Sequence, residues 1–307
     1  CEATIQLNYQ TVNDSTYAEA LLSNLGILNY RLGDFSAALS SFKKSLKIQE
    51  IIYNSQSEKV SIGYLNLGIM YKNLGIYNQS LSYLNKGLFL QKSSGIKNEL
   101  ALAKYYNNIG DLYVDMGDYQ LAIDYLLQSL HIYETHPDQK VFEKSIVSFS
   151  LGTAYSKIGE NSLTLKYTDK AYSIAQKLLD NGHPYMVFLK DNYASLLVNI
   201  DKKKEARVLY EKGLAYIRKN NSDNIPEISR YLVNIGITYL PMNPEKALTS
   251  FMNAVTIYEE KFGTKNTTII QYYLWVAEAH LLLNSNYQAI NFIDKWIETI
   301  KIIDGIV

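Results

Sequence analysis

Several features that often settle a function are scarce in this sequence. It contains one cysteine, Cys1, and five prolines among 307 residues. A single cysteine excludes a disulfide within the chain and a cysteine metal site. The 30 lysines and arginines balance the 30 aspartates and glutamates, so no overall charge attracts nucleic acid or anionic lipid. No apolar run approaches the roughly 18–20 residues needed to cross a bilayer, so we expect no membrane span.

Motifs for catalysis and metal binding are lacking as well. The four histidines are scattered, and none has the spacing of a His-Glu-x-x-His zinc motif. The sequence has no phosphate-binding loop and no Gly-x-Ser-x-Gly turn. Cys1 has no histidine partner in the pattern, which argues against a thiol protease dyad. We therefore predict no catalytic residues, no cofactor and no metal, and a protein that is not an enzyme.

The sequence does contain a repeat with a period of 42 residues, in which one step is 41. The first series is made of small residues: Gly26, Gly68, Gly110, Gly152, Ala194, Gly236 and Ala277. Seven residues beyond each lie Gly33, Gly75, Gly117, Gly159, Asp201, Asn243 and Asn284. A third series contains Ala38, Ser80, Ala122, Thr164, Ala206, Ala247 and Ala289. A period held along the whole chain indicates stacked helical units rather than two globular domains.

Each series has a mechanical interpretation. A small residue inside a helix lets a second helix approach closely, which explains glycine where it costs about 1 kcal/mol relative to alanine. The second series holds only Gly, Asp and Asn, which tolerate the left-handed backbone that ends a helix. The third series is the small residue of the second helix that faces the first. Apolar residues such as Leu81, Leu84 and Leu88 recur at helical spacing, which predicts an all-α chain.

Two stretches match a known repeat family. Residues 66–71 read Asn-Leu-Gly-Ile-Met-Tyr, followed by Gly75, Tyr77 and Ser80, and residues 108–113 read Asn-Ile-Gly-Asp-Leu-Tyr. This pattern resembles the tetratricopeptide repeat family, and the long period resembles its kinesin-light-chain class, also found in bacterial sensors and CHAT-associated proteins. The resemblance implies one right-handed superhelical solenoid of about seven repeats. We place them at 15–54, 55–97, 98–138, 139–181, 182–222, 223–263 and 264–307.

The two ends and the sixth repeat depart from the regular pattern. Residues 1–14 are expected to form the tail of a preceding repeat, so the chain resembles a segment of a longer array. An amino-terminal Cys1 is also what a processed bacterial lipoprotein shows. We favour a cytoplasmic location, with a lipoprotein or periplasmic location as the alternative. In the sixth repeat one residue is missing and Pro241 and Pro244 fall at the turn, which predicts a shortened first helix.

One polar series runs along the first helices, which line the concave surface of such a solenoid. It consists of Asn24, Asn66, Asn108, Ser150, Asn192, Asn234 and Trp275. An amide offers a donor and an acceptor, which suits a peptide backbone, and in the tetratricopeptide family such an asparagine ladder grips peptide main chain. The competing interpretation is that these amides bond neighbouring repeats or water. Lys104 and Arg230, with Lys72 and Lys157, lie on or near this face and could meet a ligand carboxylate, unless they are simply solvated.

Two functions remain open at this point. The first is a scaffold that binds a polypeptide or protein in its concave groove, without nucleic acid. The second is the regulatory or sensor region of a larger protein whose effector, a CHAT protease or a histidine kinase, lies outside residues 1–307. A receptor for a short secreted signalling peptide is a third interpretation. The residues predicted to bind the peptide are Asn24, Asn66, Asn108, Asn192, Asn234, Lys104 and Arg230.

Overall fold

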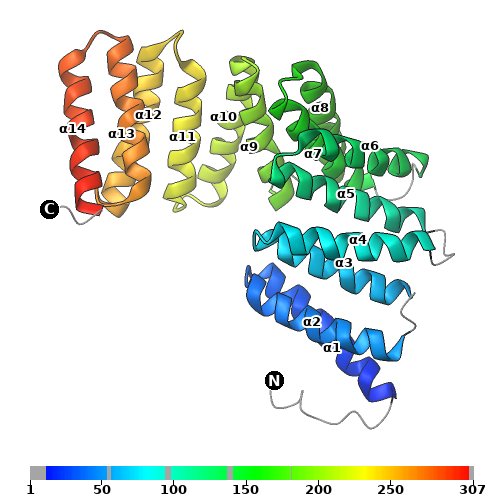
Figure 1. Cartoon of the computed structure of the whole chain (residues 1–307). Helices are drawn as coiled ribbons and strands as arrows, with labels where there is room; N and C mark the ends of the chain where they lie inside the picture. The colour runs from blue at the N-terminus through cyan, green and yellow to red at the C-terminus, as the bar shows by residue number, and fades with distance from the viewer. Residues whose placement is uncertain (1–11, 54–56, 94–97, 137–140, 181, 304–307) are drawn as a thin grey trace. The chain divides into compact units, whose positions relative to one another are not determined.

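A computed structural model describes residues 12–53, 57–93, 98–136, 141–180 and 182–303 (Figure 1). These residues form fourteen α-helices and no strands. The helices are α1 (Val12–Arg31), α2 (Phe35–Ile52), α3 (Glu58–Asn73), α4 (Tyr77–Ser93), α5 (Glu99–Met116), α6 (Tyr119–Thr135), α7 (Val141–Lys157), α8 (Asn161–Leu178), α9 (Pro184–Asn199), α10 (Lys203–Asn220), α11 (Ile225–Tyr239), α12 (Pro244–Phe262), α13 (Thr267–Leu282) and α14 (Asn286–Ile303). The predicted all-α solenoid of helix pairs is thus confirmed. Cys1 and most of the predicted leading tail lie outside the described residues.

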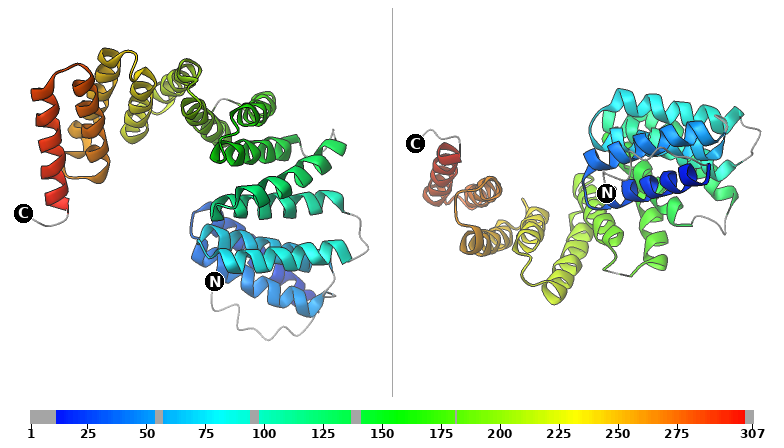
Figure 2. Two further views of the ribbon diagram at one scale, coloured as in Figure 1. Left: turned by 45° about the horizontal axis from the view of Figure 1, so that its top comes forward. Right: turned by 90° about the horizontal axis from the view of Figure 1, so that it is seen from below.

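The helices fall into two compact units, Cys1–Ile174 and Ala175–Val307, and each is described by itself. In the first unit α1 packs on α2, α3 on α4 and α5 on α6, and each pair packs on the helix that follows it. In the second unit the pairs are α9 with α10, α11 with α12 and α13 with α14, joined in the same manner. Figure 2 shows the neighbouring helices side by side within each unit. Within the units, α3, α5, α11 and α13 therefore each have their own second helix and the preceding second helix as neighbours.

The first series of small residues marks the closest approach inside each pair. A Cβ atom added at Gly110 would lie 2.6 Å from Cγ of Leu126 and 3.2 Å from the backbone oxygen of Ala122. At Gly236 the added atom would lie 2.3 Å from the ring of Phe251. All three distances are shorter than an ordinary van der Waals contact. Glycine is therefore required there by the neighbouring second helix, as the sequence predicted.

The second series ends the first helices, with one exception. Gly33, Gly75, Gly117 and Gly159 have φ between 73° and 83°, while Asp201 and Asn284 have φ of 60° and 58°. Asn243 does not follow, because its φ is −144° and its side chain caps α12 by accepting from the backbone N–H of Lys246. The expectation of a left-handed residue there is wrong. Two nearby prolines explain the difference: α11 ends at Tyr239, before the cis Leu240–Pro241 bond, and α12 starts at Pro244.

Stacked tyrosines tie the two helices of a pair together in the first unit. The ring pairs are Tyr71 with Tyr83 at 5.4 Å, Tyr113 with Tyr125 at 5.7 Å and Tyr155 with Tyr167 at 5.4 Å between centroids. Their interplanar angles are 7°, 18° and 6°. The three pairs keep the 42-residue period. Many of the 27 tyrosines are thus explained by packing.

A second kind of contact joins consecutive pairs. Gly87 on α4 lies under the ring of Tyr105 on α5, and an added Cβ would be 2.3 Å from the tyrosine hydroxyl oxygen. Gly213 on α10 and Tyr231 on α11 repeat this arrangement in the second unit, with 2.5 Å to the ring. Both tyrosines are almost fully buried. We call each of these a glycine–tyrosine joint.

Candidate functional site

The five predicted asparagines lie on successive first helices of each unit. Asn24, Asn66 and Asn108 belong to α1, α3 and α5 of the first unit, and Asn192 and Asn234 belong to α9 and α11 of the second. Asn24 is exposed and the other four are partly exposed, so none is buried between repeats. Their amides are therefore accessible to a ligand. Their alignment in a single line along the chain stays a prediction, because the two units are described separately.

Two of these amides are oriented by their own helix. Nδ2 of Asn108 donates to the backbone oxygen of Lys104 at 2.8 Å, and Nδ2 of Asn192 donates to that of Phe188, also at 2.8 Å. Both bonds reach back one helical turn. Each leaves the amide oxygen and one N–H free for another partner. The amide of Asn234 has no hydrogen bond to any described residue.

The two predicted basic residues differ in their surroundings. Lys104 on α5 is exposed. Arg230 on α11 donates from Nη2 to Oδ2 of Asp191 on α9 at 2.7 Å, and from the same nitrogen to Oε1 of Glu227 at 3.2 Å. Lys104 is therefore available to a ligand carboxylate, whereas Arg230 already has two carboxylate partners.

Lys72 and Lys157, the other two lysines near this face, also differ in their surroundings. Nζ of Lys72 on α3 lies 4.0 Å from a carboxylate oxygen of Asp115 on α5, whereas Lys157 is exposed. Burial raises the pKa of the neighbouring Asp111, against the charge of Lys72 and a hydrogen bond from Ser150. Ser150 is the serine of the asparagine series. At that position the short side chain supports an acid of the preceding first helix.

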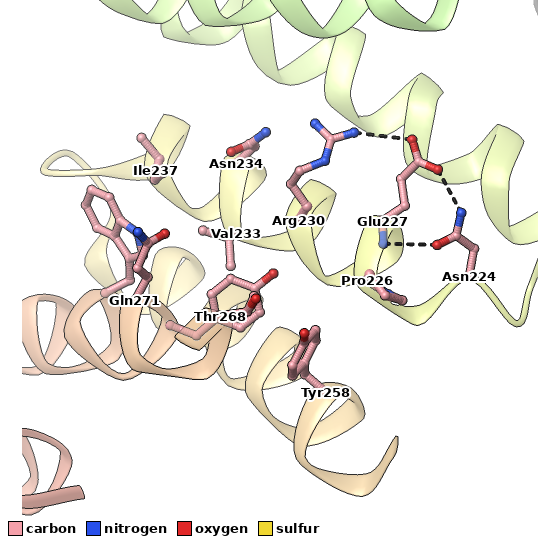
Figure 3. A pocket seen from close by; sticks show the side chains of 12 residues that line it. Asn224, Pro226, Glu227, Arg230, Val233, Asn234, Ile237, Tyr258, Thr268 and Gln271 are labelled. Atoms are coloured by element: carbon pink, nitrogen blue, oxygen red, sulfur yellow. Dashed lines mark hydrogen bonds and ion pairs between the residues drawn. The ribbon is translucent and has the colours of Figure 1, made fainter. Parts of the chain in front are cut away.

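A pocket of about 610 Å³ opens between α11 and α13 in the second unit (Figure 3). Its lining residues are Asn224, Pro226, Glu227, Arg230, Val233, Asn234, Ile237, Tyr258, Thr268, Gln271, Tyr272 and Trp275. It therefore contains both residues of α11 that the sequence singled out, Asn234 and Arg230. It also contains Trp275, which takes the asparagine position on α13. The volume lies in the range of ordinary ligand pockets.

One wall of the pocket is aromatic and held by packing. Trp275 stacks on Phe251, with centroids 5.9 Å apart and 25° between the planes. Tyr258 and Tyr272 meet edge to face at 5.5 Å and 78°. Burial raises the pKa of Tyr272 to about 12, so its hydroxyl stays protonated at neutral pH. This wall is thus a fixed, uncharged surface.

The polar side of the pocket is a hydrogen-bonded group. The side-chain hydroxyl of Tyr231 donates to Oδ1 of Asp191, whose other oxygen accepts from Arg230. Nδ2 of Asn224 donates to Oε2 of Glu227 at 2.9 Å, and the backbone N–H of Glu227 donates back to the Asn224 oxygen (Figure 3). Burial and the carboxylate of Asp191 raise the pKa of Tyr231, which stays protonated. Burial opposes the charge of Arg230, but Asp191 outweighs it and raises the pKa of that guanidinium.

The sequence pattern did not predict the roles of Asp191, Glu227, Asn224 and Tyr231. A signal for two of them was present, because Asn224-Ile-Pro-Glu227 has the form of a helix start in which the cap and the third helical residue bond each other. Asp191 and Tyr231 gave no local signal. Their contact spans 40 residues and depends on how α9 packs beside α11.

The fold and the repeats define a tetratricopeptide-type helical solenoid. A tetratricopeptide repeat family model matches residues 16–93 and 59–135, which confirms the repeats predicted for that part of the chain. No curated protein matches the sequence. No helix of the described part has the length and apolar character needed to span a membrane.

Solved structures with the same fold cover most of the chain. A signal transduction ATPase with numerous domains and a tetratricopeptide repeat sensor, from Pyrococcus horikoshii, has a TM-score of 0.69 at 16% identity, over 97% of this chain and 46% of its own. A Rap protein complexed with Competence and Sporulation Factor has a TM-score of 0.62 at 12% identity, over 99% and 79%. Kinesin light chain repeats from Podosopora anserina have a TM-score of 0.53 at 16% identity, over 67% and 99%. At these identities the similarity establishes the fold.

Proposed function

We propose that this chain is a scaffold that binds a polypeptide on the surface formed by its first helices. Asn24, Asn66, Asn108, Asn192 and Asn234 pair with the ligand's main chain. Lys104 and Arg230 contribute to the choice of ligand. The observation that carries the proposal is the pocket between α11 and α13, because it holds the unpaired amide of Asn234 beside an aromatic wall.

The chemistry suits a peptide better than a small charged metabolite. Amides pair with both peptide groups without requiring a particular side chain, and aromatic surface binds apolar side chains. A Rap protein with the same fold is complexed with Competence and Sporulation Factor, which supports a ligand-binding role for this fold. Each amide bond contributes only about 1 kcal/mol, so affinity requires several of them together with the pocket.

A role as the sensor region of a larger protein is the second candidate. It is favoured by the similarity to the ATPase with a tetratricopeptide sensor, since this chain covers 46% of that protein. The two candidates share the same ligand surface. They differ in whether ligand binding is the output of the protein or the input to an effector such as a CHAT protease or a histidine kinase.

Selection of peptides from a random 12-residue phage library against the purified chain tests the proposal. Selected peptides are then measured by fluorescence anisotropy against the parent and against the pairs Asn66→Ala/Asn108→Ala and Asn192→Ala/Asn234→Ala. Each lost bond of about 1 kcal/mol weakens binding about fivefold, so the affected pair loses about 25-fold. Asn85→Ala is the matched control, because Asn85 is an exposed helical asparagine on the second helix α4. Parent-like affinity in both pairs would contradict the asparagine ladder.

A further inference from the structure

The charge of Arg230 is already compensated at the pocket. Its Nη2 binds two carboxylates, those of Asp191 and Glu227. Glu227 and Arg230 are the charged side chains among those that line the pocket. Lys190 also interacts with Asp191, but it does not line the pocket. The guanidinium therefore does not present a free positive charge to a ligand.

Arg230 keeps hydrogen-bond donors that its carboxylate partners do not use. In Asp191, Oδ2 accepts a hydrogen bond from Arg230 and Oδ1 accepts one from Tyr231. In Glu227, Oε1 accepts from Arg230 and Oε2 accepts from Asn224. Nε and Nη1 of Arg230 have no partner among the described residues, and its side chain is 44% exposed. Asp191 is only 15% exposed, so a ligand reaches it poorly. Arg230 can thus donate further hydrogen bonds, although its positive charge is already paired with Asp191 and Glu227.

Such a group distinguishes between ligand acceptors. A peptide carbonyl gains a hydrogen bond from Arg230 and brings no charge. A ligand carboxylate gains the same bond but is placed beside the carboxylates of Asp191 and Glu227, and like charges at short range repel strongly in a partly buried site. The opposite wall, with Tyr272 and Trp275, favours a large apolar side chain.

We propose that this pocket selects an uncharged peptide segment: a bulky apolar side chain lies against Trp275 and Tyr272, and a backbone carbonyl accepts from Arg230. Acidic side chains are rejected there. This inference rests on the proposed peptide-binding function and adds its specificity. The sequence suggested that Arg230 attracts a ligand carboxylate. Because Asp191 and Glu227 already bind Arg230, we propose instead that it donates to an uncharged carbonyl.

The test removes the compensating charges and keeps the arginine. The same phage library is selected against the parent, against Glu227→Gln and against Asp191→Asn/Glu227→Gln, with helicity and melting temperature measured for each. On the parent we expect peptides rich in aromatic and aliphatic residues and poor in acidic ones. A selected peptide and a version carrying one Asp beside its apolar anchor are then compared by anisotropy. The parent should prefer the neutral peptide about tenfold, and the double variant should remove or invert this preference because Arg230 is left uncompensated.

Each outcome decides a separate point. Enrichment of acidic peptides on the parent overturns this inference and leaves peptide binding intact. The same holds if the folded double variant keeps the parent's preference for the neutral peptide over the Asp-carrying peptide. Binding that survives Trp275→Ala also overturns it, because the peptide then lies elsewhere. If no peptide is enriched on the parent, the proposed function fails, and the inference fails with it. If the double variant does not fold, Glu227→Gln decides, since it removes one partly exposed charge and should shift the preference partway.

Discussion

Gly110 provides a sharp test of how the helix pairs are held together. A side chain there would lie 2.6 Å from Cγ of Leu126, which is fully buried, and 3.2 Å from the backbone oxygen of Ala122. Leucine adds four carbons at this position, so we take the upper end of the overpacking cost, about 3 kcal/mol. The better helix propensity of leucine returns about 1 kcal/mol. Gly110→Leu should therefore destabilise the α5–α6 pair by about 2 kcal/mol.

A rescue substitution makes the geometry itself testable. Leu126→Ala alone should cost about 3 kcal/mol through the cavity it leaves. Together with Gly110→Leu it exchanges a large and a small residue across the same contact, and volume-conserving exchanges usually cost less than about 1.5 kcal/mol. The sum of the two single changes is about 5 kcal/mol, so the pair should be about 3.5 kcal/mol less destabilised than additivity predicts.

Amide hydrogen exchange measures this locally, without requiring a two-state unfolding transition of the whole solenoid. In Gly110→Leu the protection of α5 and α6 should fall about thirtyfold, which corresponds to about 2 kcal/mol. The protection of α13 and α14 serves as the internal control and should stay unchanged. Parent-like protection in Gly110→Leu, or additive losses in the double variant, would refute the close-approach argument.

Two further predictions concern the helix ends and the pH dependence. Asp201→Gly should raise the free energy of unfolding in urea by about 0.5–1 kcal/mol, because glycine adopts the left-handed φ of 60° without a Cβ penalty. Asn243→Gly should bring no gain, because Asn243 has φ −144° and caps α12. Equal gains at both positions would contradict this assignment. Burial lowers the pKa of His280 below its ordinary 6.5, so the unfolded chain binds more protons in mild acid and stability should fall as the pH drops from about 7.5 to about 5.5. His280→Tyr should flatten that part of the melting-temperature profile, and an equally steep profile would show that other groups cause it.

The fold could be predicted from the sequence because its requirements are local and repeated. Gly110 is needed because Leu126, only sixteen positions later in the chain, packs against it, and Gly117 is needed because that single residue has a left-handed backbone. Seven copies of such constraints fix the period even where one copy fails. The exception at Asn243 arises where two prolines and a missing residue replace the ordinary turn.

The site was less predictable because its contacts join different repeats. The asparagine series identified Asn234, and the charge one turn earlier identified Arg230. The state of Arg230 was hidden, since Asp191 lies 39 residues before it and meets it only through the packing of α9 and α11. The aromatic wall was predicted only at Trp275, the last member of the asparagine series; Tyr258 was missed because it belongs to a second helix, where tyrosine first suggests packing.

The glycine–tyrosine joint between α10 and α11 has a mechanical consequence. Tyr231 packs its ring against Gly213 and uses its hydroxyl to hold Asp191, which in turn holds Arg230. The side chain of Tyr231 therefore takes part both in the packing of α10 on α11 and in the hydrogen-bonded group that orients Arg230. By reciprocity, a ligand that binds Arg230 more tightly when the Tyr231–Asp191 hydrogen bond is formed must stabilise that hydrogen bond by the same free energy.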